Sequence, residues 1–174
     1  VDATLAPDAT RATLRAALDH DGRIDGEVTL SGSGSTQALA GRVDLALNSL
    51  AFVELLTPAV AAVQGRVSAN LSLGGTTAQP QVQGSASVAG FAAEIPAAGL
   101  QLHDGEVMVR ASDLEHFTLD GRIGSGGGTL ALSGSGGGNE LHATIKGENF
   151  LAADIPAAMV LVSPDLRIDR DDKR

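Results

Sequence analysis

The four histidines of this 174-residue sequence are the side chains best suited to exchange protons or bind a metal at neutral pH. A metal site or an acid–base pair would need several such groups at short, regular spacing or facing one another across two elements. The histidines instead lie far apart, at His20, His103, His116 and His142. The aspartates fall at expected turns or on polar strand faces, where Asp commonly stabilises local backbone. We therefore expect no metal site, no catalytic residue and no enzymatic activity.

Glycine clusters are a second feature that could do chemistry, because glycine-rich loops cradle phosphates. The sequence contains 22 glycines, and eight of them gather in two clusters at residues 124–128 and 134–138. Neither cluster completes the G-x-G-x-x-G or the G-x-x-x-x-G-K-[ST] pattern, and neither clearly opens a helix. We interpret these clusters as turns and expect no cofactor.

Composition and charge limit the possible partners. The formal net charge is −9, which argues against nucleic acid and against an anionic membrane surface, since both are recognised through cationic contacts. The 43% hydrophobic residues are mostly Ala, Val and Leu, with four Phe and no Trp, Tyr or Cys. A closed core usually needs bulkier side chains on facing layers. The composition therefore favours a thin or open architecture.

Alternation of apolar and polar residues organises the stretch 65–90. Apolar residues occupy every second position from Val67 to Leu73 and again from Val82 to Val88, on either side of a Gly-Gly-Thr-Thr-Ala-Gln-Pro break. Because successive strand side chains point to opposite faces, this predicts a hairpin with one aliphatic face and one small, polar face. Similar segments recur at roughly ten-residue spacing along the chain, as in an all-β meander.

The large apolar residues of these strands are candidates for a binding surface. We expect them to line one concave apolar face of an elongated, curved sheet. They are Val67, Leu71, Leu73, Val82, Val88, Val107, Val109, Phe117, Leu119, Ile123, Leu130, Leu132, Leu141 and Ile145.

One segment departs from this alternation. From Ser49 to Val63 apolar residues recur at spacings of three and four, which favours one short helix near residues 50–63, ended or kinked by Pro58. We expect this helix to plug or cover the apolar face; an extended insert is the alternative. Its apolar stripe would be Leu50, Val53, Leu56 and Val60.

The remaining segments indicate a repetitive chain. Residues 91–99 contain Pro96 and predict an irregular crossing, and residues 167–174 predict a solvated tail. The motif Asp-Gly-Arg-Ile occurs at 21–24 and again at 120–123, which reflects either a structural repeat or chance. We interpret residues 1–174 as a single β-rich segment of a longer, repeat-like protein.

A longer pattern resembles a known family. Residues 65–88 read G-x-V-x-A-x-L-x-L-x-G-T-x-x-x-P-x-V-x-G-x-A-x-V, and Ser163-Pro-Asp-Leu166 follows near the end. These motifs resemble the C-terminal region of the TamB family, the translocation and assembly module subunits, within the wider group of AsmA-like and bridge-like lipid-transfer proteins. The resemblance implies a taco-like curved sheet with an open apolar groove and no catalytic residues.

The resemblance also implies a location and partners. The protein would be periplasmic, anchored in the inner membrane by an N-terminal helix outside this segment, and partnered with a TamA-like outer-membrane β-barrel of the Omp85 class. Its groove would carry phospholipid acyl chains to the outer membrane and support assembly of autotransporters and other outer-membrane proteins. Two alternatives stay open: a chaperone scaffold that binds unfolded barrel strands by β-augmentation, and a structural β-solenoid stalk with a filled interior.

Overall fold

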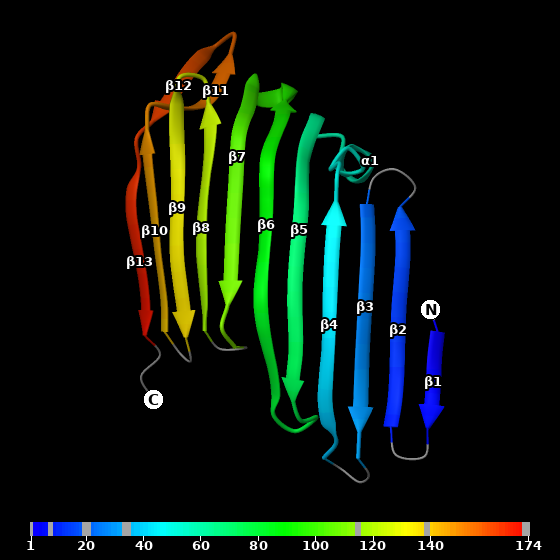
Figure 1. Cartoon of the computed structure of the whole chain (residues 1–174). Coiled ribbons are helices and arrows are strands. Elements are labelled where there is room, and N and C mark those ends of the chain that lie inside the picture. Colours follow the sequence, from blue (N-terminus) through cyan, green and yellow to red (C-terminus); the bar gives the residue numbers. More distant parts are fainter. Residues whose placement is uncertain are drawn as a thin grey trace.

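The chain forms one large antiparallel sheet. The computed structural model describes residues 2–6, 9–18, 22–32, 36–113, 116–137 and 140–171. Within these residues, eleven strands pair in the order β1-β2-β3-β4-β5-β6-β7-β8-β9-β10-β13 (Figure 1). A hairpin of two further strands, β11 and β12, interrupts this succession between β10 and β13. The prediction of an all-β, curved sheet is confirmed.

The strands follow the predicted alternation and end at glycine-rich or polar turns. Their bounds are β1 Asp2–Ala6, β2 Ala9–Leu18, β3 Gly22–Ser31, β4 Ala38–Leu47, β5 Ala61–Gly75, β6 Pro80–Ile95, β7 Leu100–Ala111, β8 Phe117–Ser125, β9 Gly128–Gly137, β10 Glu140–Glu148, β11 Phe150–Ile155, β12 Ala158–Val162 and β13 Asp165–Asp171. The sheet is open, with β1 and β13 at its two edges.

The strand register aligns residues of one kind into rows that cross the sheet. Val67 of β5 pairs with Val88 of β6, and Val88 pairs with Val107 of β7. Directly opposed residues of neighbouring strands lie on the same face, so a row keeps its character as it crosses the strands. We call the face that carries these valines the apolar face and the opposite one the polar face.

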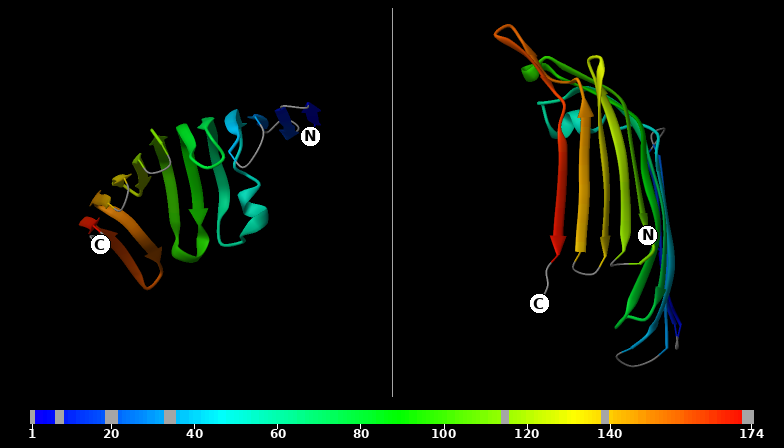
Figure 2. Two further views of the ribbon diagram at one scale, coloured as in Figure 1. Left: turned by 90° about the horizontal axis from the view of Figure 1, so that it is seen from below. Right: turned by 90° about the vertical axis from the view of Figure 1, so that its left-hand side faces the viewer.

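A crease crosses β5, β6 and β7 near one end of the sheet. The pairing register shifts within Ala61–Arg66, Val88–Ala93 and His103–Glu106, in each case by a bulge or irregularity. Bulges bend a strand and increase its twist. Beyond the crease the strand ends turn toward the side on which α1 (Val53–Leu56) and the β11–β12 hairpin lie (Figure 2). We call this end of the strands the crease end and the opposite one the far end.

Left-handed residues make the crease possible. Gly90 has a φ of 62°, and two residues with side chains, Ala62 and Asp104, each have a φ of 52°. This conformation costs free energy for any residue with a Cβ atom, so its occurrence in neighbouring strands at one level marks a built-in bend.

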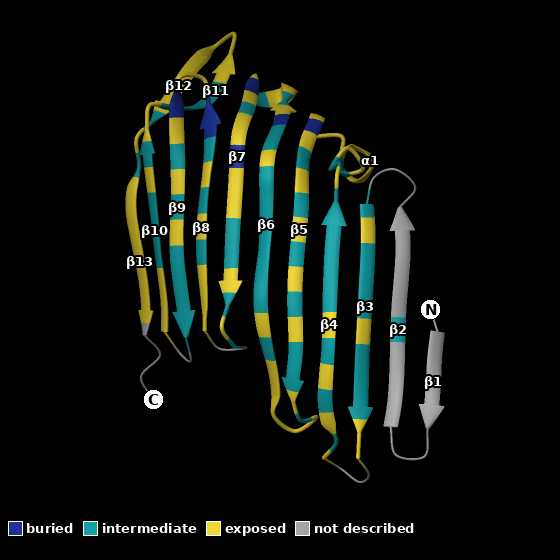
Figure 3. Cartoon of the chain, in the orientation of Figure 1, coloured by how far each residue is buried: buried dark blue, intermediate teal, exposed yellow. Residues whose placement is uncertain are grey.

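The buried interior of the described residues lies at the crease end (Figure 3). Val63, Ala93 and Leu100 are the buried hydrophobic residues there. The strand β11 contacts β7, β8, β9 and the short 3₁₀ turn η1 (Pro96–Ala98). We call α1, η1, β11 and β12 together the overhang, because they cover this end of the sheet on one side.

Two sequence predictions about irregular segments need correction. The helix near residues 50–63 exists, but it is a single turn, Val53–Leu56, and β5 already begins at Ala61. The expected crossing at 91–99 is mostly strand, because bulges let β6 continue to Ile95 while it stays paired with β7.

Two further predictions fail at the ends of strands. Residues 167–171 are not a tail: they belong to β13, which pairs with β10. The Asp-Gly-Arg-Ile motifs are not equivalent either. Residue 21 lies outside the described residues, Gly22 opens β3, and Gly121 lies inside β8. The short motif is therefore no sign of a structural repeat.

Candidate functional site

All of the apolar residues expected to form a binding surface lie on the apolar face. One row runs across the sheet through Val67, Val88 and Val107 and continues through Leu132 to Ile145. Parallel rows contain the others, two residues apart along each strand. They pair Leu73 with Val82, Val109 with Leu119, and Ile123 with Leu130, and they place Leu71, Phe117 and Leu141 in one further row.

Between the crease and the far end, the apolar face is chemically uniform. Every described residue on this face of β3 to β10 is a glycine or carries a hydrocarbon side chain. The one polar side chain at the crease end of this face, Ser125, donates its hydroxyl hydrogen to the backbone oxygen of Leu151 at 2.8 Å. This bond also shows that β11 lies on the apolar side of the sheet.

The apolar face is only partly shielded from water. Val107 is 37% exposed and Phe117 and Leu141 are each 38% exposed, although none of the three is in an edge strand. A soluble monomer rarely leaves a large contiguous apolar surface open, and such surfaces mark binding sites. The arrangement suits a ligand that supplies the missing second layer.

Glycines on the apolar face keep it thin. A Cβ atom at Gly41 would lie 3.2 Å from Val28 Cγ2 and 3.3 Å from Leu73 Cδ1, and one at Gly136 would overlap the ring of Phe117. The large side chains therefore lie flat over neighbouring glycines instead of standing upright. The face is therefore low at these positions.

The polar face carries a network of exposed ion pairs. Arg42 Nε lies 2.8 Å from Asp44 Oδ2, and Arg167 Nε lies 2.7 Å from Asp169 Oδ2. His142 Nδ1 is 2.6 Å from Asp169 Oδ1. Hydrogen bonds from His142 and then Arg167 lower the pKa of Asp169, and Arg42 followed by Asn70 lowers that of Asp44.

The three described histidines each lie beside a different aspartate. His103 Nδ1 is 2.9 Å from Asp104 Oδ2, and His116 Nδ1 is 2.8 Å from Asp113 Oδ1. The hydrogen bond to Asp104 and a second one to the Gly126 carbonyl raise the pKa of His103. Within the described residues no three His, Asp or Glu side chains gather as metal ligands.

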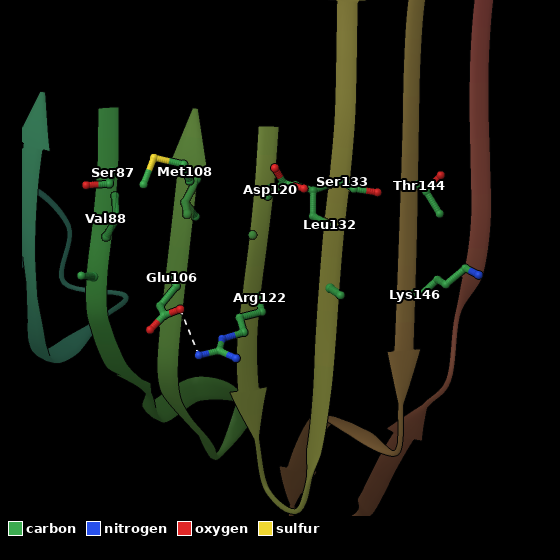
Figure 4. A pocket seen from close by; sticks show the side chains of 14 residues that line it. Ser87, Val88, Glu106, Met108, Asp120, Arg122, Leu132, Ser133, Thr144 and Lys146 are labelled. Atoms are coloured by element: carbon green, nitrogen blue, oxygen red, sulfur yellow. Dashed lines mark ion pairs between the residues drawn. The ribbon is translucent and has the colours of Figure 1, made fainter. Parts of the chain in front are cut away.

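A hollow of about 880 Å³ lies on the polar face, over β6 to β10 (Figure 4). Its walls include the ion pair of Arg122 Nη2 with Glu106 Oε2, at 3.0 Å, and the side chains of Met108 and Lys146. Val88, Val107 and Leu132 belong to the strands at its floor. This hollow lies between charged side chains on the polar face, and it is not the expected apolar groove.

The helix stripe forms only in part. Leu50, Val53 and Val60 are half-buried, but Leu56 is 76% exposed. Because the helix has a single turn, residues four positions apart do not share one covered side. Its attachment is polar instead: Glu54 Oε1 accepts a hydrogen bond from the backbone nitrogen of Val63 at 2.7 Å. The single turn therefore sits at the crease.

The apolar surface of the overhang was not predicted from the sequence. Met159 is 65% exposed, and Ile155, Val160 and Leu161 are exposed as well. A repeated motif could have revealed this region: Ala-Ala-Glu-Ile-Pro-Ala-Ala at 92–98 and Ala-Ala-Asp-Ile-Pro-Ala-Ala at 152–158. Both copies turn the chain at the crease end, and β11 contacts η1 there.

An open antiparallel sheet with one uncovered apolar face defines a scaffold that presents a continuous hydrocarbon surface. A family model described as TamB, N-terminal domain, matches residues 1–88. The chain belongs to the TamB family. The resemblance had indicated the family's C-terminal region, whereas the matching model describes the N-terminal domain, so the family agrees and the region does not. No solved structure matches the chain. In the part of the chain that the structure describes, no helix is long and apolar enough to cross a membrane.

Proposed function

We propose that the apolar face binds the acyl chains of phospholipids and guides them along the sheet. The observation that supports this proposal is the unbroken row from Val67 through Val107 to Ile145, which crosses six neighbouring strands without a polar side chain. A hydrocarbon ligand needs such a surface, because any polar group on the path would have to be desolvated when a tail passes over it.

The energetics suit passage better than tight binding. Removing one methylene fully from water contributes about 0.8 kcal/mol, so a fully buried 16-carbon tail gains roughly 13 kcal/mol and a tail on an open face gains part of this. A face of Val, Leu, Ile and Ala offers nearly the same environment as a bilayer interior. The low surface over the glycines gives a tail no individual pocket in which to lodge. A tail can therefore slide along the face.

This function places the chain in a larger assembly. The segment would belong to a periplasmic, TamB-like component of the translocation and assembly module, anchored in the inner membrane by a helix outside this chain. Its outer-membrane partner would be a TamA-like β-barrel of the Omp85 class. The protein would be a non-enzymatic transport component that delivers phospholipid to the outer membrane and supports autotransporter and outer-membrane protein assembly.

A chaperone scaffold is the second candidate, and the edge strand β13 favours it. β13 pairs only with β10, and its Leu166 and Ile168 are 53% and 51% exposed. An edge with free backbone groups can accept a further strand from an unfolded barrel protein. A solenoid stalk is not supported, because its interior would be filled by stacked side chains and the described sheet has a single open layer.

The test is a charge placed on the apolar face. Leu71→Asp puts a carboxylate in the path of the tails, and Ser72→Asp puts the same group on the polar face as a matched control. The unmodified chain and the control should retain phospholipid in native mass spectrometry, and Leu71→Asp should lose it while its circular dichroism stays unchanged. If a folded Leu71→Asp variant still binds phospholipid, the lipid proposal is wrong and strand binding becomes the better candidate.

A further inference from the structure

The two ends of the strands differ in chemistry. At the crease end, the overhang exposes hydrocarbon side chains, with Leu55 88% and Met159 65% exposed. At the far end, the described turns carry polar residues: Gln37 N donates to Thr77 Oγ1 at 3.1 Å, and His116 N donates to Asp113 Oδ1 at 2.7 Å. The apolar face therefore has a hydrocarbon border along one side and a water-exposed, hydrogen-bonding border along the other.

The width of the apolar face between these borders matches one lipid tail. On β8 the face extends from Phe117 to Ile123, and on β5 from Val67 to Leu73. Six residue steps at about 3.3 Å per residue span roughly 20 Å. The hydrocarbon core of a bilayer is about 30 Å thick, so the tails of one leaflet span roughly 15 Å. One tail fits along a strand, and two tails end to end do not.

We propose that phospholipids bind with their tails parallel to the strands, headgroups at the far end and terminal methyl groups beneath the overhang. This inference rests on the proposed function and adds the orientation of the ligand. Burying a charged headgroup against the overhang would cost several kcal/mol, whereas at the far end the headgroup stays in water beside Asp113, His116 and Thr77. The tail end loses its contact with water under the hydrocarbon side chains of the overhang.

The same geometry assigns a side of entry. The overhang is fixed to the sheet by the hydrogen bonds of Ser125 with Leu151 and of Glu54 with Val63. Among the described residues, the far end carries a short turn at residues 76–79 between β5 and β6. Lipids therefore enter and leave the apolar face at the far end of the strands, and the overhang does not have to move.

The absence of tryptophan and tyrosine from the sequence provides a direct test, because one introduced tryptophan is then the sole indole emitter. Phe117→Trp places the reporter near the far end, and Ile123→Trp places it near the crease. Thr118→Trp, on the polar face of the same strand, is the matched control. Each variant is loaded with phosphatidylcholine that carries bromine, which quenches tryptophan, either next to the glycerol or near the terminal methyl group.

The expected pattern is reciprocal. Phe117→Trp should be quenched several-fold more by bromine next to the glycerol, Ile123→Trp several-fold more by bromine near the methyl end, and Thr118→Trp by neither. If Ile123→Trp does not fold, Leu130→Trp, its partner in register, reports from the same row.

Three results would overturn the inference, and they differ in what they leave standing. Equal quenching of both apolar-face reporters by both lipids means that tails cross the strands, and a reversed pattern means that headgroups lie at the overhang. In either case lipid is bound and the proposed function stands. No quenching together with no phospholipid in native mass spectrometry removes the proposed function as well.

Discussion

The crease end and the open apolar face are built from the same kinds of residue but treat them in opposite ways. At the crease, Leu100 and Val63 are buried under the overhang, at 8% and 4% exposure. On the open face, equally apolar residues such as Leu119 and Leu132 stay half-buried, because no other described element packs over them. The comparison teaches that this sheet separates its stability from its binding surface. Packing under the overhang holds one end together, whereas the open face is held by backbone pairing and by contacts between neighbouring side chains of the same sheet.

The largest contrast should come from a charge placed in each region. Leu100→Asp buries a carboxylate in the small interior, which should cost more than about 3 kcal/mol of unfolding free energy or prevent folding. Leu119→Asp on the open face lets the carboxylate reach water and should cost about 1 kcal/mol. Urea denaturation followed by circular dichroism measures both, and equal losses would show that the two regions are packed alike.

A second contrast concerns the bond that fixes the overhang. Ser125→Ala removes the donor to the Leu151 carbonyl and leaves that oxygen without its buried partner, which should cost about 1–3 kcal/mol. Amide hydrogen exchange in β11 and β12 should speed up more than in β3 and β4. Ser133→Ala, an exposed serine on the polar face of β9, is the control and should change neither measurement.

Glycines on the apolar face allow a finer comparison. Gly84 has a φ of 154°, and a Cβ atom there would lie 2.9 Å from Leu71 Cα, so Gly84→Ala should cost about 1–3 kcal/mol. In Gly136→Ala the new Cβ atom would meet the ring of Phe117, which is exposed enough to swing away, so this substitution should cost about 1 kcal/mol or less. Thermal unfolding of the two variants measures both losses. If Gly136→Ala lowers the Tm more than Gly84→Ala does, the ring is held firmly.

The smallest expected effect is on the polar face and depends on pH. The pKa of Asp169 is lowered in the folded state, first by His142 and then by Arg167, so its charged form stabilises the fold above the ordinary value of 3.8. This contribution is lost as the pH falls through the lowered folded-state pKa. Asp169→Asn should therefore lower the Tm slightly at neutral pH. At a pH well below 3.8 the variant and the parent should unfold alike, and a persistent difference there would point to lost packing instead.

Much of the sheet could be predicted from alternation alone, because one slipped residue would move a whole strand's aliphatic set to the other face. Because of this constraint, the sequence alone predicts that Leu71, Leu119 and Ile145 lie on one face, without knowledge of which strands pair. The short helix was overestimated, because spacings of three and four at residues 50–63 also fit a loop in which only Val53 to Leu56 turns.

Hydrophobic periodicity could not predict the crease or the overhang. A left-handed residue such as Ala62 or Asp104 carries no pattern in the sequence, and its bend depends on the bulges in the neighbouring strands. The hairpin β11–β12 could not be placed from the sequence, because alternation within a strand does not say where that strand pairs. Its position depends on the long-range contacts of Leu151 with Ser125 and Gly126.

The order of the strands has a kinetic consequence. From β1 to β10 each strand pairs with the next one along the chain, so every pairing closes a short loop. Short loops cost little entropy to close and form quickly. A chain that leaves a translocation channel from its N-terminus could therefore add strands to the sheet one at a time, as they emerge. The exception is β13, which pairs with β10 across the β11–β12 hairpin, so its pairing closes the longer loop of residues 149–164.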